Sequence, residues 1–428
     1  MDIEKRVDGY VEARRERLVA ITRDLVRRPS ENTAPCGAER DCQEYLAAAL
    51  SGMGWDVALY RPDEVPGVTE HPIYWPGRDY TGRPNLGARL KGAGGGRSLV
   101  LSGHIDTVPR GSAPWTRDPF GGEIEGNRLY GRGSYDMKAG DAANLFVAEA
   151  LHGLGLRLAG DLVIEAVVDE EFGGVNGTLA GRLAGYNGDA AIISEPTTLR
   201  ICPANRGGRT VNITFRGSGG IMGLAKPGAG AVDQLGRFLA ALGDFSTRRR
   251  ASAAVHPLYR HTGDHVPVSV NKVFTAPWGF NEPPTVPETC RVELFWQAMP
   301  GETVEEIDRQ FFTWFDQMLA AAPDVFVVRP EIEYPIRWLP GSAISPHEPL
   351  VTELSAAAEA ALGKPPLVQG IEAPCDMYVF HGMGIPAVLW GATGANAHNP
   401  DEYVEIDSVV AAAKALLLFV CRWCGTAR

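Results

Sequence analysis

Histidines and acidic residues recur where buried strands are expected to end and loops to begin. His104 and Asp106 directly follow the apolar run 98–102. The other members of the set are Asp136, Glu170, Glu171, Glu195 and His398. An imidazole beside a carboxylate is oriented and made more basic, as in metal-ligating histidines, and two histidines with several carboxylates suit Zn, Mn or Co better than Ca or Mg. The set therefore predicts a centre for one or two divalent transition metals.

The acidic run Asp169-Glu170-Glu171 indicates what that centre would do. Adjacent carboxylates at a buried strand end repel each other, so a cation is needed to hold them together. A bridging carboxylate would hold two metals about 3.5 to 4 Å apart, and a spare glutamate would take a proton from the water that they activate. This is the chemistry of a hydrolase that cleaves a carbon–nitrogen bond in a small molecule.

These residues must be carried by strands that end at one edge of a sheet. Apolar runs predict strands at 98–102, 162–168 and 190–194. Helical periodicity lies before and between them, at 2–28, 38–53 and 137–151. Such alternation is typical of an α/β fold with a mixed, mostly parallel sheet flanked by helices. Ligands gather at the carboxyl ends of the strands in sheets of this kind.

From about residue 205 the order of elements changes. The pattern there predicts strand, helix, strand, strand, helix and strand, at 210–215, 231–242, 266–274, 289–296, 304–321 and 325–328. This β-α-β-β-α-β order is a known compact module. A buried strand at 387–390 then resumes the first pattern. We therefore expect a catalytic domain made of 1–204 and 335–428, interrupted by an inserted domain at 205–334.

Composition limits the partners and the compartment. A formal net charge of −11 disfavours nucleic acid and anionic membranes as partners, because both attract basic surfaces. The first 28 residues lack the apolar region of a secretory signal, and the apolar run 409–420 is too short to span a bilayer. Seven cysteines without framework spacing suit a reducing compartment. A cytoplasmic protein that acts on a small molecule is expected.

In this order, the segments resemble the M20 family of metallohydrolases, which includes deacetylases, desuccinylases and carboxypeptidases. The segments that carry the resemblance are Gly103-His-Ile-Asp106, Gly131-Arg-Gly133, Asp136-Met-Lys138, Asp169-Glu-Glu171, Ser194-Glu-Pro196 and Ala397-His-Asn-Pro400. The resemblance implies a zinc-peptidase-like fold whose inserted domain serves as a lid and joins two copies into a homodimer.

Position by position, the resemblance also implies a ligand set. His104 and Glu195 would bind one metal, Glu171 and His398 the other, and Asp136 would bridge the two.

Three further acids take roles from the same resemblance. Glu170 would be the general base, and Asp106 would orient His104. Asp376 matches a family acid near the site and could manage protons or make a structural hydrogen bond. All these positions are filled, which disfavours a non-catalytic binding protein on the same scaffold.

The lid departs from the family pattern. Ile221 stands where the family has a substrate-binding histidine, Pro284 near its asparagine and Gln297 where it has an arginine. Isoleucine cannot donate a hydrogen bond, and the loss of one oxyanion donor typically costs about 2.7 to 4 kcal/mol. These losses indicate a flatter, more apolar substrate that tolerates Ile221 and Met222. Phe280, Phe295 and Trp296 would line or support its pocket or pack in the core.

Two reactions follow as alternatives. The losses favour hydrolytic deamination of an aromatic amine such as 5-nitroanthranilate, with release of ammonia. The alternative is an N-acyl-amino-acid deacylase or carboxypeptidase. This alternative would be favoured if Arg206, Arg209 or Arg337 binds the substrate carboxylate in place of the lost arginine.

Overall fold

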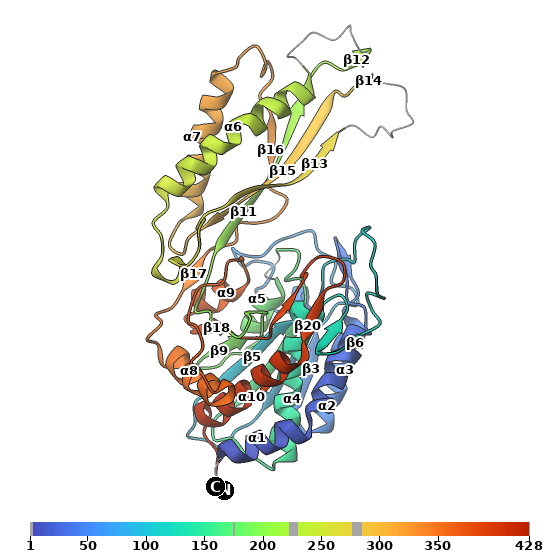
Figure 1. Ribbon diagram of the computed structural model, residues 1–428, viewed down its shortest axis with the longest axis vertical. Coiled ribbons are helices and arrows are strands. Elements are labelled where there is room, and N and C mark those ends of the chain that lie inside the picture. The colour runs from blue at the N-terminus through green and yellow to red at the C-terminus, as the bar shows by residue number, and fades with distance from the viewer. Residues whose placement is uncertain (1–2, 174–175, 222–229, 276–284, 428) are drawn as a thin grey trace. The chain divides into compact units, whose positions relative to one another are not determined.

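The structure is a computed structural model that describes residues 3–173, 176–221, 230–275 and 285–427. The chain forms two compact units (Figure 1). Unit 1 contains residues 1–204, 343–371 and 375–428, and unit 2 contains residues 205–342 and 372–374. Unit 2 therefore continues past residue 334 and also takes up a short piece of the later chain.

A six-stranded sheet forms the centre of unit 1, in the order β18-β9-β5-β8-β4-β3. Its strands are β3 (Asp56–Tyr60), β4 (Asn85–Leu90), β5 (Leu99–His104), β8 (Leu162–Val167), β9 (Ala191–Ile193) and β18 (Ala387–Leu389). The four strands from β18 to β8 are parallel, β4 pairs antiparallel with β8, and β3 pairs antiparallel with β4. The mixed, mostly parallel sheet is confirmed, although strands β3 and β4, which make its antiparallel pairs, were not among the strands predicted from the sequence.

Both faces of this sheet are covered. Leu99 and Leu101 belong to one hydrophobic cluster and Val100 to another, because successive side chains in a strand point to opposite faces. Strands buried on both faces have near-continuous apolar runs, as β5 and β8 do. Because these strands are buried on both faces, their apolar runs could be recognised in the sequence.

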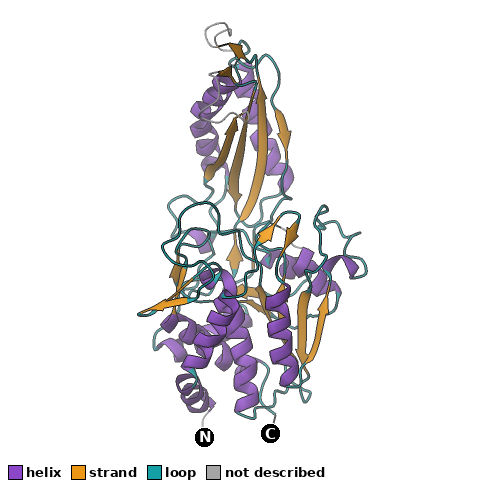
Figure 2. Cartoon of the chain, turned by 90° about the vertical axis from the view of Figure 1, so that its right-hand side faces the viewer, coloured by secondary structure: helices purple, strands orange, loops and turns teal. Residues whose placement is uncertain are grey.

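The helices of unit 1 lie on both sides of its strands (Figure 2). They are α1 (Ile3–Ala13), α2 (Arg15–Val26), α3 (Arg40–Gly52), α4 (Ala139–Gly153), α5 (Asn176–Leu183), α8 (Pro349–Leu362), α9 (Met377–Gly382) and α10 (Ile406–Trp423). The apolar helix α10 packs against α4 and α8. Within the described ranges, no helix has both the length and the apolar character that crossing a membrane requires.

A second, smaller sheet of unit 1 joins distant parts of the chain. Its order is β19-β20-β7-β6, formed by β6 (Glu123–Glu125), β7 (Arg128–Tyr130), β19 (Gly394–Ala395) and β20 (Tyr403–Glu405). Antiparallel pairing sets Tyr403 opposite Tyr130. The loop between β19 and β20 is thereby brought beside the segment that follows β7.

Unit 2 is an antiparallel sheet with two helices. The sheet order is β13-β15-β11-β16, and the expected β-α-β-β-α-β order is confirmed. The elements are β11 (Gly207–Arg216), α6 (Ala231–Ser252), β13 (Val268–Thr275), β15 (Thr289–Ala298), α7 (Val304–Ala320) and β16 (Glu331–Glu333). A short pair also forms between β12 (Gly220–Ile221) and β14 (Thr285–Val286). Helix α7 begins in a capping box, in which Thr303 and Glu306 bond each other's backbone.

One expectation for unit 2 needs correction, and one of two alternatives left open for Trp296 is decided in favour of core packing. The last strand was expected at 325–328, but Val327 and Val328 lie in a loop with 73% and 57% of their surface exposed. The strand is instead β16: in the apolar run Phe326 enters the core and Val325 packs against it, but Val327 and Val328 do not contribute to it. Trp296 does not line a pocket: it is fully buried, and its ring stacks on Phe311 at 5.0 Å between centroids.

Candidate metal centre

The predicted metal ligands come together in unit 1, at the carboxyl ends of its parallel strands. His104 is the last residue of β5, Glu171 follows β8, and Glu195 follows β9. Asp136 lies in the turn before α4, and His398 lies in the loop between β19 and β20. His398 has a φ of 63°, a left-handed conformation that non-glycine residues rarely adopt and that often marks functional sites.

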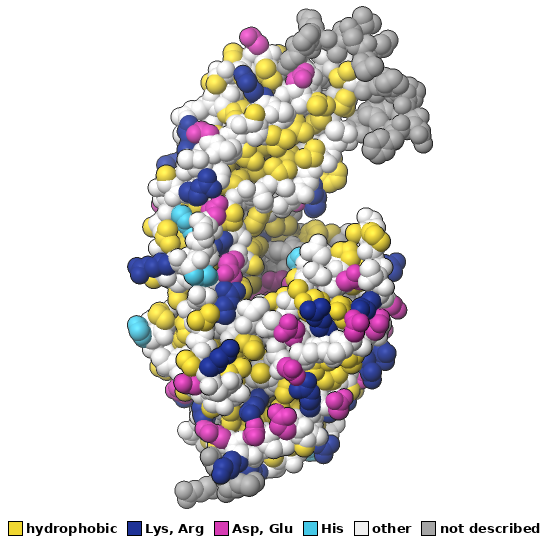
Figure 3. All heavy atoms as spheres, viewed as in Figure 1, with side chains coloured by type: hydrophobic (Ala, Val, Ile, Leu, Met, Phe, Trp, Pro, Cys, Tyr) yellow, Lys and Arg dark blue, Asp and Glu magenta, His cyan; other side chains and the backbone are white. Residues whose placement is uncertain are grey.

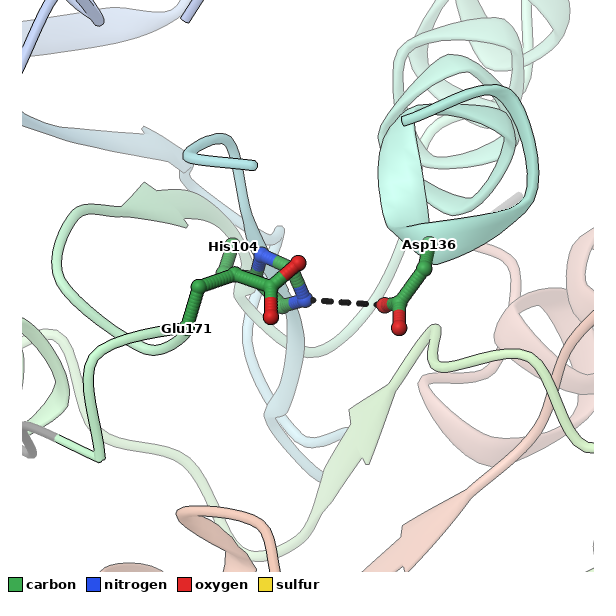
Figure 4. Close-up of side chains that lie close together, drawn as sticks. All are labelled: His104, Asp136 and Glu171. Carbon is green, nitrogen blue, oxygen red and sulfur yellow. Dashed lines mark hydrogen bonds and ion pairs between the residues drawn. The ribbon is translucent and has the colours of Figure 1, made fainter. Parts of the chain in front are cut away.

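Asp136 faces both histidines. Its Oδ1 lies 3.2 Å from Nε2 of His104, as Figure 4 shows, and its Oδ2 lies 3.4 Å from Nε2 of His398. Each carboxylate oxygen thus points to a different imidazole. This is the geometry expected of a carboxylate that bridges two cations.

The remaining acids divide between the two histidines. Glu171 Oε2 is 2.9 Å from Nε2 of His398, and Glu195 Oε1 is 3.6 Å from Nε2 of His104. Donor atoms within 4.8 Å of one another form two groups, one of His104, Asp136 and Glu171 and one of His104, Glu170 and Glu195. Glu170 therefore lies among the ligands, where a general base would be needed.

Asp106 contacts both the histidine and the acidic turn. Nδ1 of His104 lies 2.9 Å from the Asp106 carbonyl oxygen but 3.7 Å from its Oδ1, so the backbone makes the closer contact. The carboxylate of Asp106 instead accepts hydrogen bonds from the backbone N–H groups of Glu170 and Glu171, at 3.2 and 3.1 Å. This fully buried side chain holds the acidic turn in place.

Glu402 is a structural member of the site that the sequence reasoning missed. Its buried carboxylate accepts hydrogen bonds from the backbone N–H groups of Gly133, Tyr135 and Asp136, at 2.9 to 3.0 Å. It also pairs with Arg132 at 2.6 Å. The sequence signal was weak, because Glu402 lies in a polar loop where an exposed glutamate is the ordinary expectation.

Asp376 lies outside both groups of donor atoms in the described chain. It precedes α9, and its carboxylate accepts a hydrogen bond from the Thr178 hydroxyl. Burial raises the pKa of Asp376, and burial also raises the pKa of Glu170, with the charges of Glu195 and Asp376 adding to that rise. A structural hydrogen bond and an electrostatic influence on Glu170 are thus both present.

Comparison with known proteins identifies the family. Residues 100–422 match the family described as Peptidase family M20/M25/M40. The chain belongs to this family. It is therefore an M20 metal-dependent hydrolase that acts on carbon–nitrogen bonds.

Individual relatives cover nearly all of this M20 chain. An N-formyl-4-amino-5-aminomethyl-2-methylpyrimidine deformylase from Bacillus subtilis is 24% identical over 97% of this chain and 96% of its own length. A succinyl-diaminopimelate desuccinylase from Cereibacter sphaeroides is 29% identical over 91% and 94%. The solved structure of the di-peptidase Dug1p from Saccharomyces cerevisiae has a TM-score of 0.80 at 14% identity and covers 100% and 99% of the two chains, which shows the shared fold.

The charges of the M20 site fit a divalent cation. Hydrogen bonds to Asp136 and Glu171 raise the pKa of His398 to about 11. Burial opposes protonation of His104, but Glu195 and Asp136 raise its pKa well above the ordinary value. Burial also raises the pKa of Glu171 and Glu195. Without metal, the site therefore binds protons on its imidazole nitrogens and carboxylate oxygens. A divalent metal would replace these protons.

We expect metal binding to release protons near neutral pH. Because the pKa of His398 is raised to about 11 and that of His104 is raised well above its ordinary value, both are protonated without metal and must lose those protons to ligate it. Affinity should therefore rise as the pH increases from 6 to 8. Calorimetric titration of the apo-protein with Zn²⁺ or Mn²⁺, in buffers of different ionisation enthalpy, would count the protons. An affinity independent of pH over this range would contradict the assignment.

The lid residues named from the sequence have internal partners in unit 2. Nε2 of Gln297 donates to the Glu372 carbonyl at 2.7 Å, and its Oε1 accepts from Arg206 at 2.6 Å. Arg209 makes two hydrogen bonds to Asp308, at 2.9 and 2.6 Å. Gln297 and Arg209 are therefore engaged within the unit.

The remaining lid positions named from the sequence are Arg337, Phe295, Ile221, Met222, Phe280 and Pro284. Nε of Arg337 donates to the carbonyl oxygen of Trp338. Phe295 is partly buried. For Ile221 only the backbone is described, as part of β12. The positions outside the described residues are Met222, Phe280 and Pro284.

Proposed function

We propose that this M20 hydrolase removes a small acyl group, formyl first among them, from the amine of a small molecule that lacks an amino-acid carboxylate. The observation that carries the hydrolytic part is Glu170 grouped with His104 and Glu195. Two deformylases, 24% and 26% identical over 97% of the chain, support the acyl group. Gln297 in place of an arginine supports a substrate without a carboxylate.

Deamination of an aryl amine such as 5-nitroanthranilate is our second candidate. It would use the same metal ligands and the same base. The apolar Ile221 and the internally bonded Gln297 favour a flat, uncharged substrate for either reaction. The acyl reaction comes first because the named relatives are amidases.

Glu170 has two tasks in the proposed reaction. When bound, divalent metals polarise the scissile carbonyl and lower the pKa of water. Glu170 accepts a proton as water adds to the carbonyl carbon, and it donates that proton to the nitrogen as the carbon–nitrogen bond breaks. Burial, with Glu195 and Asp376 adding to it, raises the pKa of Glu170, which suits a group that both takes and returns a proton. The products are a carboxylic acid and an amine.

We propose Zn, Mn or Co as the metal, since nitrogen and oxygen donors suit all three. We also propose a cytoplasmic location. The seven cysteines, none of which forms a disulfide within the described chain, support a reducing compartment.

A substrate panel tests the proposal. The metal-loaded protein would be given N-formyl and N-acetyl heteroaromatic amines, N-acetyl amino acids, dipeptides and nitroanthranilates, with release of amine or ammonia measured. Amine release from the formyl compounds, with little from acyl amino acids, is expected. Ammonia from nitroanthranilates alone would replace the proposal with deamination, and preference for acyl amino acids would show that another group binds a carboxylate.

We further propose a homodimer formed through unit 2. Strand β13 lies at the sheet edge, where its Val273 and Phe274 side chains are 48% and 52% exposed. Hydrophobic side chains gather over the strands of this unit on the face seen in Figure 3. An exposed edge strand with apolar side chains is a ready site for pairing with another chain.

Phe274→Asp should convert the dimer to a monomer, because a buried charge at a paired edge is costly. Light scattering coupled to size-exclusion chromatography would measure the mass. Val327→Asp, in an exposed loop of the same unit, is the matched control and should remain dimeric. A wild-type protein that is monomeric at micromolar concentration would refute the proposed dimer.

A further inference from the structure

Asp169, which directly precedes the general base, has an unusual conformation and many partners. Its φ is 77°, a region that residues with a side chain rarely occupy unless their surroundings impose it. Its carboxylate is fully buried and accepts hydrogen bonds from Nε of Arg78, at 2.8 and 3.0 Å, and from the Tyr80 hydroxyl, at 2.7 Å. These bonds fix the residue that sets the direction of the acidic turn.

Asn32 links Asp169 to the second support of that turn. Its Nδ2 donates to Oδ1 of Asp169 at 3.1 Å and to Oδ2 of Asp106 at 2.8 Å. Its Oδ1 accepts a hydrogen bond from Nη2 of Arg78. Asp106 in turn accepts the backbone N–H groups of Glu170 and Glu171. A continuous chain of buried hydrogen bonds therefore runs from Arg78 to the peptide groups of the base and its neighbour.

The segment that carries Arg78 is tied to the same region. The Arg78 side chain is only 3% exposed, and its guanidinium lies 4.4 Å from the centre of the Phe172 ring. Asn176 bonds both backbone groups of Trp75, at 2.9 and 2.7 Å, and donates to the Tyr80 hydroxyl at 2.9 Å. Arg78 is thus held against the acidic turn from both sides.

We infer that Arg78 and Asn32 are positioning residues that hold the Glu170–Glu171 turn in its reactive geometry, Arg78 through Asp169 and Asn32 through both Asp169 and Asp106. The inference rests on the proposed role of Glu170. Neither residue belongs to the two groups of metal donors. Their removal should therefore misplace the base without removing a ligand, and small misplacements of a reacting group are costly in rate.

The test uses Arg78→Met, with Arg78→Lys as a milder variant and Arg61→Met as the matched control. Arg61 precedes the same loop and pairs with Asp63 and Glu64 at the surface. In the metal-loaded Arg78→Met protein, hydrogen exchange of the amides in 168–172 should rise at least about tenfold. Arg61→Met should leave that exchange unchanged, and metal content should equal that of the wild type in all three variants.

Kinetic measurements test whether the loss of activity in the Arg78 variants depends on Glu170. Arg78→Met should lower kcat about tenfold to a hundredfold with little change in KM, and Arg78→Lys should recover part of the loss. In a Glu170→Gln background, the same Arg78 substitution should have almost no further effect, because residues that act as a unit are not additive.

Each arm can overturn the inference. Unchanged exchange in 168–172 would show that Arg78 does not hold the turn. Equal losses of kcat in the wild-type and Glu170→Gln backgrounds would show that Arg78 acts by another route. If the wild type cleaves no amide in the panel, the proposed function fails, and the exchange arm still decides whether Arg78 positions the turn.

Discussion

Glu170→Gln should remove most turnover and leave the metal in place. The glutamine amide has nearly the size of the glutamate side chain and can still form hydrogen bonds, but it cannot accept a proton from water. The loss of a general base typically lowers the rate by about 10² to 10⁴-fold. The proposed ligands His104 and Glu195 remain beside it. We would measure kcat on the best substrate of the panel together with metal content by mass spectrometry.

The neighbouring Glu171 provides the contrast for this experiment. It shares the turn and its pKa is also raised by burial, but its Oε2 faces His398 at 2.9 Å. Glu171→Gln should therefore lower metal content together with rate. Wild-type turnover in the Glu170→Gln protein would refute the role of base, and loss of metal from it would make Glu170 a ligand instead.

Asp136→Ala should empty both metal positions. Each of its carboxylate oxygens faces one histidine, so the substitution removes a donor from both sides at once. Changes to groups that merely support ligands already cost about 10 to 100-fold in affinity, and the loss of a shared ligand should exceed that. Metal per chain after dialysis, and the metal-dependent rise in melting temperature, would measure the effect.

His398→Ala is the matched comparison for Asp136→Ala. It removes a donor on one side only, because His104 keeps Asp136, Glu170 and Glu195 nearby. One metal position should therefore remain occupied, with a lower rate. Retention of two metals by the Asp136→Ala protein would show that the carboxylate does not bridge.

The parallel part of the sheet was predictable because strands buried on both faces are apolar throughout. Antiparallel β3 and β4 were not predicted, since β3 is mostly exposed and its mixed residues give no clear period. In unit 2, the apolar residues 325–328 were misread as a strand. Two of the four, Val327 and Val328, are exposed, and strand β16 is defined by pairing with β11 over three residues.

The residues proposed as metal ligands were easier to find in the sequence than the residues that support them. His104, Glu171 and His398 stand in short motifs at the ends of strands or in a loop, and their chemistry is visible in the residue types. Glu402 and Asn32 act through backbone and side-chain hydrogen bonds across long sequence separations. Such contacts leave no local pattern, so they become visible only once the chain is folded.

The pairing of β20 with β7 also determines the stage of protein synthesis at which the metal centre can form. Glu402 reaches the backbone of Asp136 across a sequence separation of 266 residues, and His398 arrives on the same late segment. A nascent chain that has not yet exposed this segment has the first strands of its sheet but neither the second histidine nor the support of Asp136. Filling of the metal position that needs His398 should therefore be confined to chains whose helix α10 is already being made, so that incomplete chains on the ribosome do not hold a metal pair.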